Sequence, residues 1–152
     1  VSRMMLEYVR SKACEEGSSS IKTHHAGFLT MDFPPESFDA IVSGLALHHL
    51  PDAWKLAALR HVYRVLKTEG KFIFRDVVFS LRSGEEPEEC FVRFVDSFNE
   101  QIRPGAIGHV RKEYSTFDWI MEGLLARAGF TLLSSRNCSQ ELMSYCCVKS
   151  GG

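Results

Sequence analysis

Hydrophobic residues along the chain follow two periodicities, one typical of strands and one typical of helices. Residues 38–45 and 71–78 are short, nearly continuous apolar runs, so we predict a strand in each. Such a run also predicts that the strand over 38–45 is parallel and covered on both faces. Between the two, residues 53–67 repeat apolar side chains at helical spacing, with Lys55 on the opposite, charged face. This order predicts a strand, a crossover helix and a second strand.

Six further segments have the patterns of helices or strands. Capping residues, glycines and prolines mark several of their ends. For example, Gly129 follows a helical pattern that Ser115 is expected to cap, and Arg103-Pro104-Gly105 is expected to end the helix before it. In chain order, the segments are a helix over 2–16, a strand over 21–26, a helix from about 85 to 102, a helix from 115 to 128, and strands over 130–134 and 142–149.

Strands that alternate with helices indicate an α/β fold with a mostly parallel sheet and helices on both faces. The last two strands follow one another without a helix, which predicts an antiparallel carboxy-terminal strand. The sequence contains no internal repeat, no low-complexity tract and no linker. We therefore expect residues 1–152 to form a single domain.

Composition excludes several classes of protein. The net charge is -1 and the pI is about 6.6, without a basic cluster, so nucleic-acid binding is not expected. No apolar run approaches the ~20 residues of a membrane span, and the first residues lack a signal-peptide pattern. The five cysteines include no Cys-x-x-Cys pair, which favours free thiols in a reducing compartment. We expect a cytoplasmic protein that binds neither nucleic acid nor membranes.

Two motifs resemble those of the class I S-adenosylmethionine-dependent methyltransferases. Residues 35–50, PESFDAIVSGLALHHL, resemble the region of that family's fourth strand, and residues 63–72, YRVLKTEGKF, resemble the turn before its fifth strand. Residues 113–119 resemble a segment of a branch that acts on small molecules, and the Asn-Pro-Pro motif of base-methylating members is absent. The resemblance implies a Rossmann-like sheet, S-adenosylmethionine as cofactor and a small-molecule methyl acceptor.

The sequence departs from the family in the region that binds the cofactor. Family members have an acidic residue and a Gly-x-Gly-x-Gly loop after the first strand, and a second acidic residue after the second strand. These 152 residues contain no such loop, and residues 1–8 resemble the helix after the second strand. Gly27 takes the position of an adenine-binding Asp. The fold is therefore expected to be an incomplete Rossmann-like sheet without the first strand, glycine loop and second strand, so cofactor binding by this chain alone is doubtful.

The resemblance places the candidate site at the carboxyl ends of the strands, where α/β folds bind ligands. It implies cofactor contacts from Gly27, Phe28, Gly44, Leu45 and His48, and an acceptor pocket with His49, Asp76 and Tyr114. No catalytic residue is assigned. For Asp76, an ion pair with Arg75 on the rim of the sheet is an equal alternative. No metal site is expected, because the pairs at 24–25 and 48–49 have no Asp, Glu or Cys at ligand spacing.

Three interpretations remain open. The chain is a methyltransferase-like protein with weak cofactor binding, a non-catalytic dimerising or partner-binding module, or a fragment of a complete enzyme. In the family's strand order, 3-2-1-4-5-7-6, the missing strands leave residues 38–45 with an unpaired edge. Either residues 21–26 pair with that edge or a second copy of the chain does, and we expect a homo-oligomer.

Overall fold

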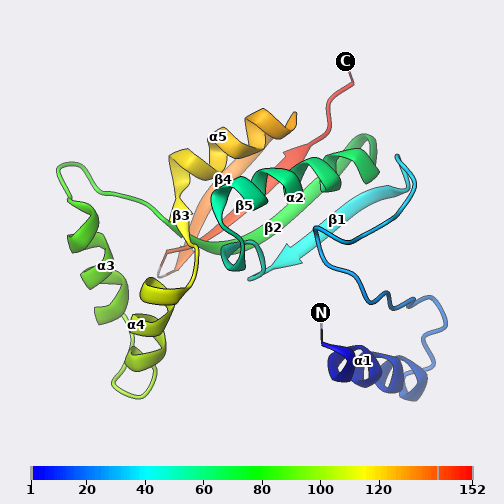
Figure 1. Ribbon diagram of the computed structural model, residues 1–152, viewed down its shortest axis with the longest axis horizontal. Coiled ribbons are helices and arrows are strands. Elements are labelled where there is room, and N and C mark those ends of the chain that lie inside the picture. The colour runs from blue at the N-terminus through cyan, green and yellow to red at the C-terminus, as the bar shows by residue number, and fades with distance from the viewer. Residues whose placement is uncertain (1, 140, 152) are drawn as a thin grey trace. The chain divides into compact units, whose positions relative to one another are not determined.

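The computed structural model describes residues 2–139 and 141–151, which fall into two compact units, Val1–Asp32 and Phe33–Gly152 (Figure 1). The first unit contains helix α1 (Arg3–Glu15), whose N-cap Ser2 accepts a hydrogen bond from the Met5 amide at 3.5 Å. The helix predicted over 2–16 is thus confirmed. The strand predicted over 21–26 is wrong, because this largely polar segment forms no strand. The single domain over 1–152 stays a prediction.

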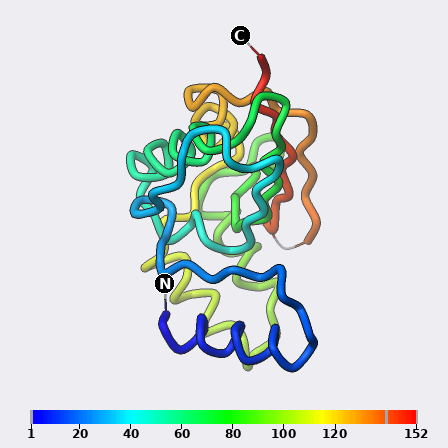
Figure 2. Tube along the Cα trace, turned by 90° about the vertical axis from the view of Figure 1, so that its right-hand side faces the viewer, coloured from blue at the N-terminus to red at the C-terminus, as the bar shows by residue number. Residues whose placement is uncertain are grey.

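The second unit is built on a five-stranded mixed sheet. The hydrogen-bonded order is β1-β2-β5-β4, and β3 pairs with the far end of β2. Strands β1 and β2 are parallel, while β5 runs antiparallel to both β2 and β4. The adjacent β4 and β5 are orange and red in Figure 2. The strands are β1 (Phe38–Gly44), β2 (Leu66–Phe79), β3 (Thr116–Phe117), β4 (Thr131–Ser139) and β5 (Leu142–Val148). The predicted α/β fold with an antiparallel carboxy-terminal strand is confirmed.

Helices α2 (Asp52–Val65) and α5 (Asp118–Ala128) lie together on one face of the sheet (Figure 1). Alternate residues of β2 and β5 point into this layer and are buried. The aromatic ring of Phe74 stacks on Phe72 and on Tyr145, with centroids 4.8 Å apart in both pairs. Burial of these side chains anchors both helices to the sheet.

The other face of the sheet carries exposed apolar side chains. Val42 of β1 is 76% exposed and its register partner Ile73 is 39% exposed. The expectation that residues 38–45 are covered on both faces is therefore wrong for the described structure. The reason is that, among the described residues of the second unit, no helix packs over this face of β1. Helices on this second face stay a prediction.

A smaller core lies beyond the end of β2, where α3 (Pro87–Asp96) and α4 (Arg103–Lys112) pack together. Its buried members are Phe79, Cys90, Phe94 and Ala106. The predicted break at residues 103–105 is wrong, because Pro104 lies in the first turn of α4, where its missing N–H costs nothing.

The start of α5 also differs from the prediction. Ser115 does not cap this helix. Thr116 and Phe117 pair with β2 instead, and α5 begins at Asp118. Its end is as predicted, at Gly129 in the left-handed conformation with φ 104°. None of the helices in the described part of the chain combines the length and apolar character needed to cross a membrane.

Candidate functional site

The candidate site lies where β1 ends beside the carboxyl end of β2. After Gly44, the Leu45 amide donates to the Arg75 carbonyl at 2.8 Å, and Leu45 adopts a left-handed φ of 52°. This backbone conformation turns the chain out of the sheet and into the short 3-10 helix η1 (Leu47–His49). His48 and His49 therefore lie at the carboxyl edge of the sheet, where α/β folds bind ligands.

Asp76, the buried carboxylate at this edge, holds η1 in place. Its side chain is 1% exposed and accepts hydrogen bonds from the amides of Ala46 at 3.2 Å and Leu47 at 2.7 Å. Oδ1 also lies 2.5 Å from Nδ1 of His48. Burial raises the pKa of Asp76, but these hydrogen bonds and the neighbouring His48 outweigh it, so the pKa lies below its ordinary value. Asp76 thus stays ionised at neutral pH.

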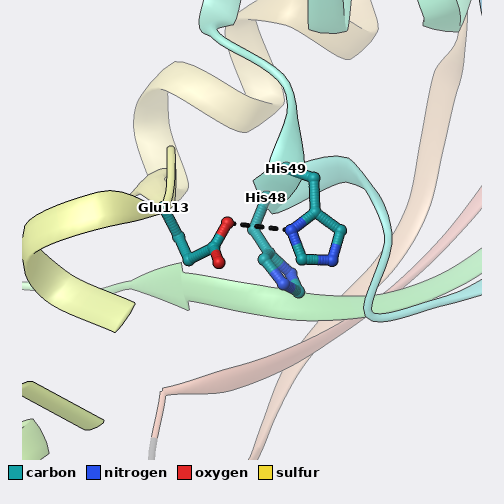
Figure 3. A group of neighbouring side chains, drawn as sticks. All are labelled: His48, His49 and Glu113. Atoms are coloured by element: carbon teal, nitrogen blue, oxygen red, sulfur yellow. Dashed lines mark hydrogen bonds and ion pairs between the residues drawn. The ribbon is translucent and has the colours of Figure 1, made fainter. Parts of the chain in front are cut away.

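His49 is more exposed and pairs with a carboxylate from a distant part of the sequence (Figure 3). Its Nδ1 lies 2.8 Å from Oε2 of Glu113, which follows the end of α4. The hydrogen bond with His49 holds the pKa of Glu113 below its ordinary value. The rings of His48 and His49 are 4.1 Å apart between centroids. A buried imidazole, an exposed imidazole and a partly exposed carboxylate therefore meet at this edge of the sheet.

A third histidine, His109 of α4, packs against His48. Its ring centroid lies 5.0 Å from that of His48, and its Nε2 lies 2.6 Å from the Ser115 hydroxyl. Burial and the nearby His48 lower the pKa of His109, which favours the neutral imidazole. A neutral ring beside His48 adds no repulsive charge to the site.

Lys55 and Tyr114 tie the segment after α4 to the site. The Tyr114 amide donates to the His48 carbonyl at 2.7 Å. The fully buried Lys55 ammonium donates to the Leu50 carbonyl, to Asp52 and to the Tyr114 carbonyl. The sequence placed Lys55 on an exposed helix face, and this is wrong because three acceptors compensate the burial of its charge.

The structure brings most of the predicted site residues together. Gly44, Leu45, His48, His49, Asp76 and Tyr114 all lie at this edge of the sheet. The rim ion pair of Asp76 with Arg75 is wrong, since the partner of Asp76 is His48. Gly27 and Phe28 belong to the other unit, where Gly27 opens a turn closed by the Thr30 side chain at 2.9 Å. The binding roles assigned to all eight residues stay predictions.

Sequence reasoning missed Glu113, His109 and Lys55 as parts of the site. Of these three, only Glu113 could have been suspected from the sequence, because it begins the segment that resembles a small-molecule methyltransferase branch. The sequence separation between His49 and Glu113 is 64 residues, so spacing alone does not reveal the pair.

Chemically, the site offers an open backbone and a histidine oriented by a carboxylate. A Cβ placed on Gly44 would meet nothing within 4 Å, so a ligand can approach the backbone there. The hydrogen bond to Glu113 leaves the other ring nitrogen of a neutral His49 to accept a proton. The Leu45 side chain is exposed beside them. These features fit a small molecule bound against the end of β1.

Comparison with known proteins finds methyltransferases among the relatives of this chain. Residues 1–74 match the family model described as a methyltransferase domain. An uncharacterized methyltransferase of Geobacillus thermodenitrificans is 29% identical over 124 residues, which cover 82% of this chain and 55% of that protein. The uncharacterized methyltransferase YcgJ of Bacillus subtilis is 34% identical, with 76% of this chain and 41% of that protein covered. The demethylmenaquinone methyltransferase of Anoxybacillus flavithermus is 26% identical, and the match covers 80% of this chain and 48% of that protein. The chain spans about half the length of these relatives.

Solved structures show the same fold. The [4+2]-cyclase SpnF superposes with a TM-score of 0.74 at 16% identity, over 100% of this chain and 64% of that protein. The structure of PigF with SAH superposes with a TM-score of 0.68 at 16% identity, over 97% of this chain and 46% of that protein. At this identity the likeness concerns the fold alone, and one of the two neighbours is named for a cyclisation.

Proposed function

We propose that this chain, as a member of the class I methyltransferase family, acts in methyl transfer from S-adenosylmethionine to a small-molecule acceptor. The observation that carries the proposal is the group at the end of β1 and β2, in which Asp76 fixes η1 and Glu113 orients His49. The name of one relative, demethylmenaquinone methyltransferase, supports a small-molecule acceptor. The cyclase among the fold neighbours makes a direct activity test necessary.

In this proposal the open end of β1 contacts the cofactor. Gly44 leaves space at the backbone, Leu45 offers an exposed apolar side chain, and His48 is held in position by Asp76. Gly27 and Phe28 are proposed as further cofactor contacts by family resemblance. When bound, S-adenosylmethionine supplies a methyl group on a positively charged sulfur. The protein's part is mainly to orient that group toward the acceptor.

The acceptor side of the proposed site is formed by His49 and Tyr114. A hydroxyl, thiol or amine that takes up a methyl group must lose a proton, and a neutral imidazole accepts protons near neutral pH. Glu113 stabilises the resulting charged ring, as a carboxylate beside a histidine does in other enzymes. Asp76 acts here as a positioning residue, because its carboxylate is turned inward to η1.

The affinity of these 152 residues for the cofactor is proposed to be low. The glycine loop and its two acidic partners supply charge-assisted hydrogen bonds worth ~1.5–3 kcal/mol each. Two such bonds correspond to a loss of affinity on the order of a hundredfold. Calorimetric titration with S-adenosylhomocysteine is expected to give no low-micromolar isotherm, and a clear one would contradict this part of the proposal.

Methyl transfer itself is tested with S-adenosylmethionine that carries a labelled methyl group. The chain is incubated with a saturating cofactor concentration and a panel of phenols, hydroquinones and amines. We expect label transfer to one acceptor class, with about a hundredfold lower rate in His49→Ala and an unchanged rate in the control His61→Ala on α2. No transfer to any acceptor at saturating cofactor would reject the catalytic role.

A second candidate function is a non-catalytic module that assembles with another copy of itself. The outer edge of β1 pairs with no strand among the described residues, and the face beside it exposes Val42 and Ile73. A second copy would satisfy the edge by strand pairing. Sedimentation equilibrium is expected to give at least twice 17.2 kDa, and Val42→Lys is expected to lower that mass. A monomer at micromolar concentration would contradict the assembly.

A further inference from the structure

We propose that His48, His49 and Glu113 form a binding site for a divalent transition-metal ion of the zinc class. One ligand atom from each residue lies within 4.8 Å of the others (Figure 3). The expectation of no metal site rested on the absence of a carboxylate close in sequence. The fold supplies one from the end of α4. The inference does not rest on methyl transfer.

The donor set favours zinc over the alkaline-earth ions. Two imidazoles and one carboxylate match the ligands that bind zinc and similar ions, whereas Mg²⁺ and Ca²⁺ prefer oxygen ligands only. A tetrahedral ion with bonds of about 2.0–2.2 Å places its ligands ~3.4 Å apart. The pair His49 Nδ1 and Glu113 Oε2, now 2.8 Å apart, needs only a small separation to admit an ion. The His49 side chain is 58% exposed, so it is free to adjust.

The Asp76 carboxylate gives His48 the hydrogen-bond support that metal-binding histidines need. Its Nδ1 is 2.5 Å from the buried Asp76 carboxylate, which fixes the tautomer and leaves Nε2 to bind an ion. Histidine ligands of zinc usually donate their other ring N–H to a carboxylate or carbonyl in this way. Asp76 is itself held by two amides, so the ring orientation is set before an ion arrives. This preorganisation is what distinguishes the site from a chance surface pair of histidines.

An ion at this site would have three protein ligands and an open fourth position. Since His49 and Glu113 lie at the surface, water or a small ligand can complete a tetrahedral geometry. The bound ion occupies atoms that also serve the proposed proton transfer at His49. The two roles are therefore alternatives for any one molecule, and metal binding must be measured directly rather than through activity.

The test uses the complete 152-residue chain after dialysis against a chelator. Zinc titration by calorimetry is expected to give one ion per chain with micromolar or tighter affinity, and Co²⁺ is expected to give the intense visible absorption of a four-coordinate ion. His49→Ala and Glu113→Gln are each expected to weaken binding at least about tenfold. Two control variants, His24→Ala/His25→Ala and His61→Ala, remove histidines outside the proposed site. Both are expected to bind zinc as the unmutated chain does.

Circular dichroism is recorded for each variant so that loss of folding is recognised. As a measurement that needs no variant, zinc is expected to protect His49 in the unmutated chain from modification by diethyl pyrocarbonate, detected by peptide mass spectrometry. The proposal is overturned if the unmutated chain binds no zinc. It is equally overturned if binding survives Glu113→Gln unchanged and disappears in the His24→Ala/His25→Ala variant.

Discussion

Nδ1 of His48 lies 2.5 Å from Oδ1 of Asp76, across 28 residues of sequence. The same carboxylate accepts hydrogen bonds from the backbone amides of Ala46, Leu47 and Val77. One buried side chain thus connects the end of β2 to the turn after β1. Every residue proposed to bind an ion or accept a proton lies on or beside the turn that this carboxylate holds.

Replacement of Asp76 is expected to destabilise the fold. Asp76→Ala leaves buried amides and the His48 ring without their acceptor, so the free energy of unfolding should fall by about 3 kcal/mol. Urea denaturation followed by circular dichroism measures the change. Asp96→Asn, which removes an exposed partner of Arg103, serves as the control and should cost less than about 0.5 kcal/mol. A loss below about 1 kcal/mol for Asp76→Ala would contradict the anchoring role.

Acid should weaken the attachment of α3 through Glu85. Hydrogen bonds from Arg93 and from the Arg82 amide lower the pKa of Glu85 from 4.5 to about 2. Because the folded-state pKa is depressed, the stabilisation is complete above pH 4.5 and is lost as the pH falls toward about 2.

Unfolding curves recorded across that pH window are expected to show a smaller acid dependence in Glu85→Gln than in the unmutated chain. Glu100→Gln, which changes an exposed carboxylate in the loop before α4, is the matched control and should leave the dependence as it was. Equal slopes for Glu85→Gln and the unmutated chain would mean that the Arg93 contact contributes nothing to acid stability.

Two glycine-to-alanine substitutions should have opposite effects. At Gly129, where φ is 104°, an added Cβ would lie 2.9 Å from the Tyr63 ring, so Gly129→Ala should destabilise by about 2 kcal/mol or more. At Gly105, inside α4, a Cβ meets nothing within 4 Å, so Gly105→Ala should stabilise by about 0.5–1 kcal/mol. Thermal unfolding of both variants checks the signs. A stabilised Gly129→Ala would show that the Tyr63 contact is absent.

The five cysteines should react at very different rates with iodoacetamide. Burial raises the pKa of Cys147 to about 12 and that of Cys90 to about 11, so both thiols stay protonated and shielded at neutral pH. Cys14 and Cys138 are exposed. Peptide mapping after brief labelling of the native chain should find Cys14 and Cys138 modified first. Rapid labelling of Cys90 without denaturant would mean that the core under α3 opens readily.

The local signals in the sequence were sufficient for most of the sheet. The strand over Phe38–Gly44, the helix that ends at Gly129 and the antiparallel ending all follow from periodicity and glycine placement, and the structure confirms them. The predicted break at Pro104 failed because proline is compatible with two opposite contexts, the end of one helix and the first turn of another.

Contacts between segments that are distant in the sequence could not be predicted from it. The burial of Lys55 depends on carbonyl groups that only the folded chain brings together, and its charge alone predicted exposure. The meeting of His49 with Glu113 depends on how α3 and α4 return the chain to the sheet. Residue type and spacing therefore located one half of the candidate site, on the turn after β1, and the tertiary fold supplied the other half.

The position of β5 has a consequence for how the protein is made. β5 follows β4 in the sequence, yet it lies between β4 and β2 in the sheet. While a ribosome is still synthesising residues 142–148, β4 has no strand to pair with among the described residues that precede it. The sheet is completed only when this strand has emerged, so the nascent chain exposes unpaired strand edges until then.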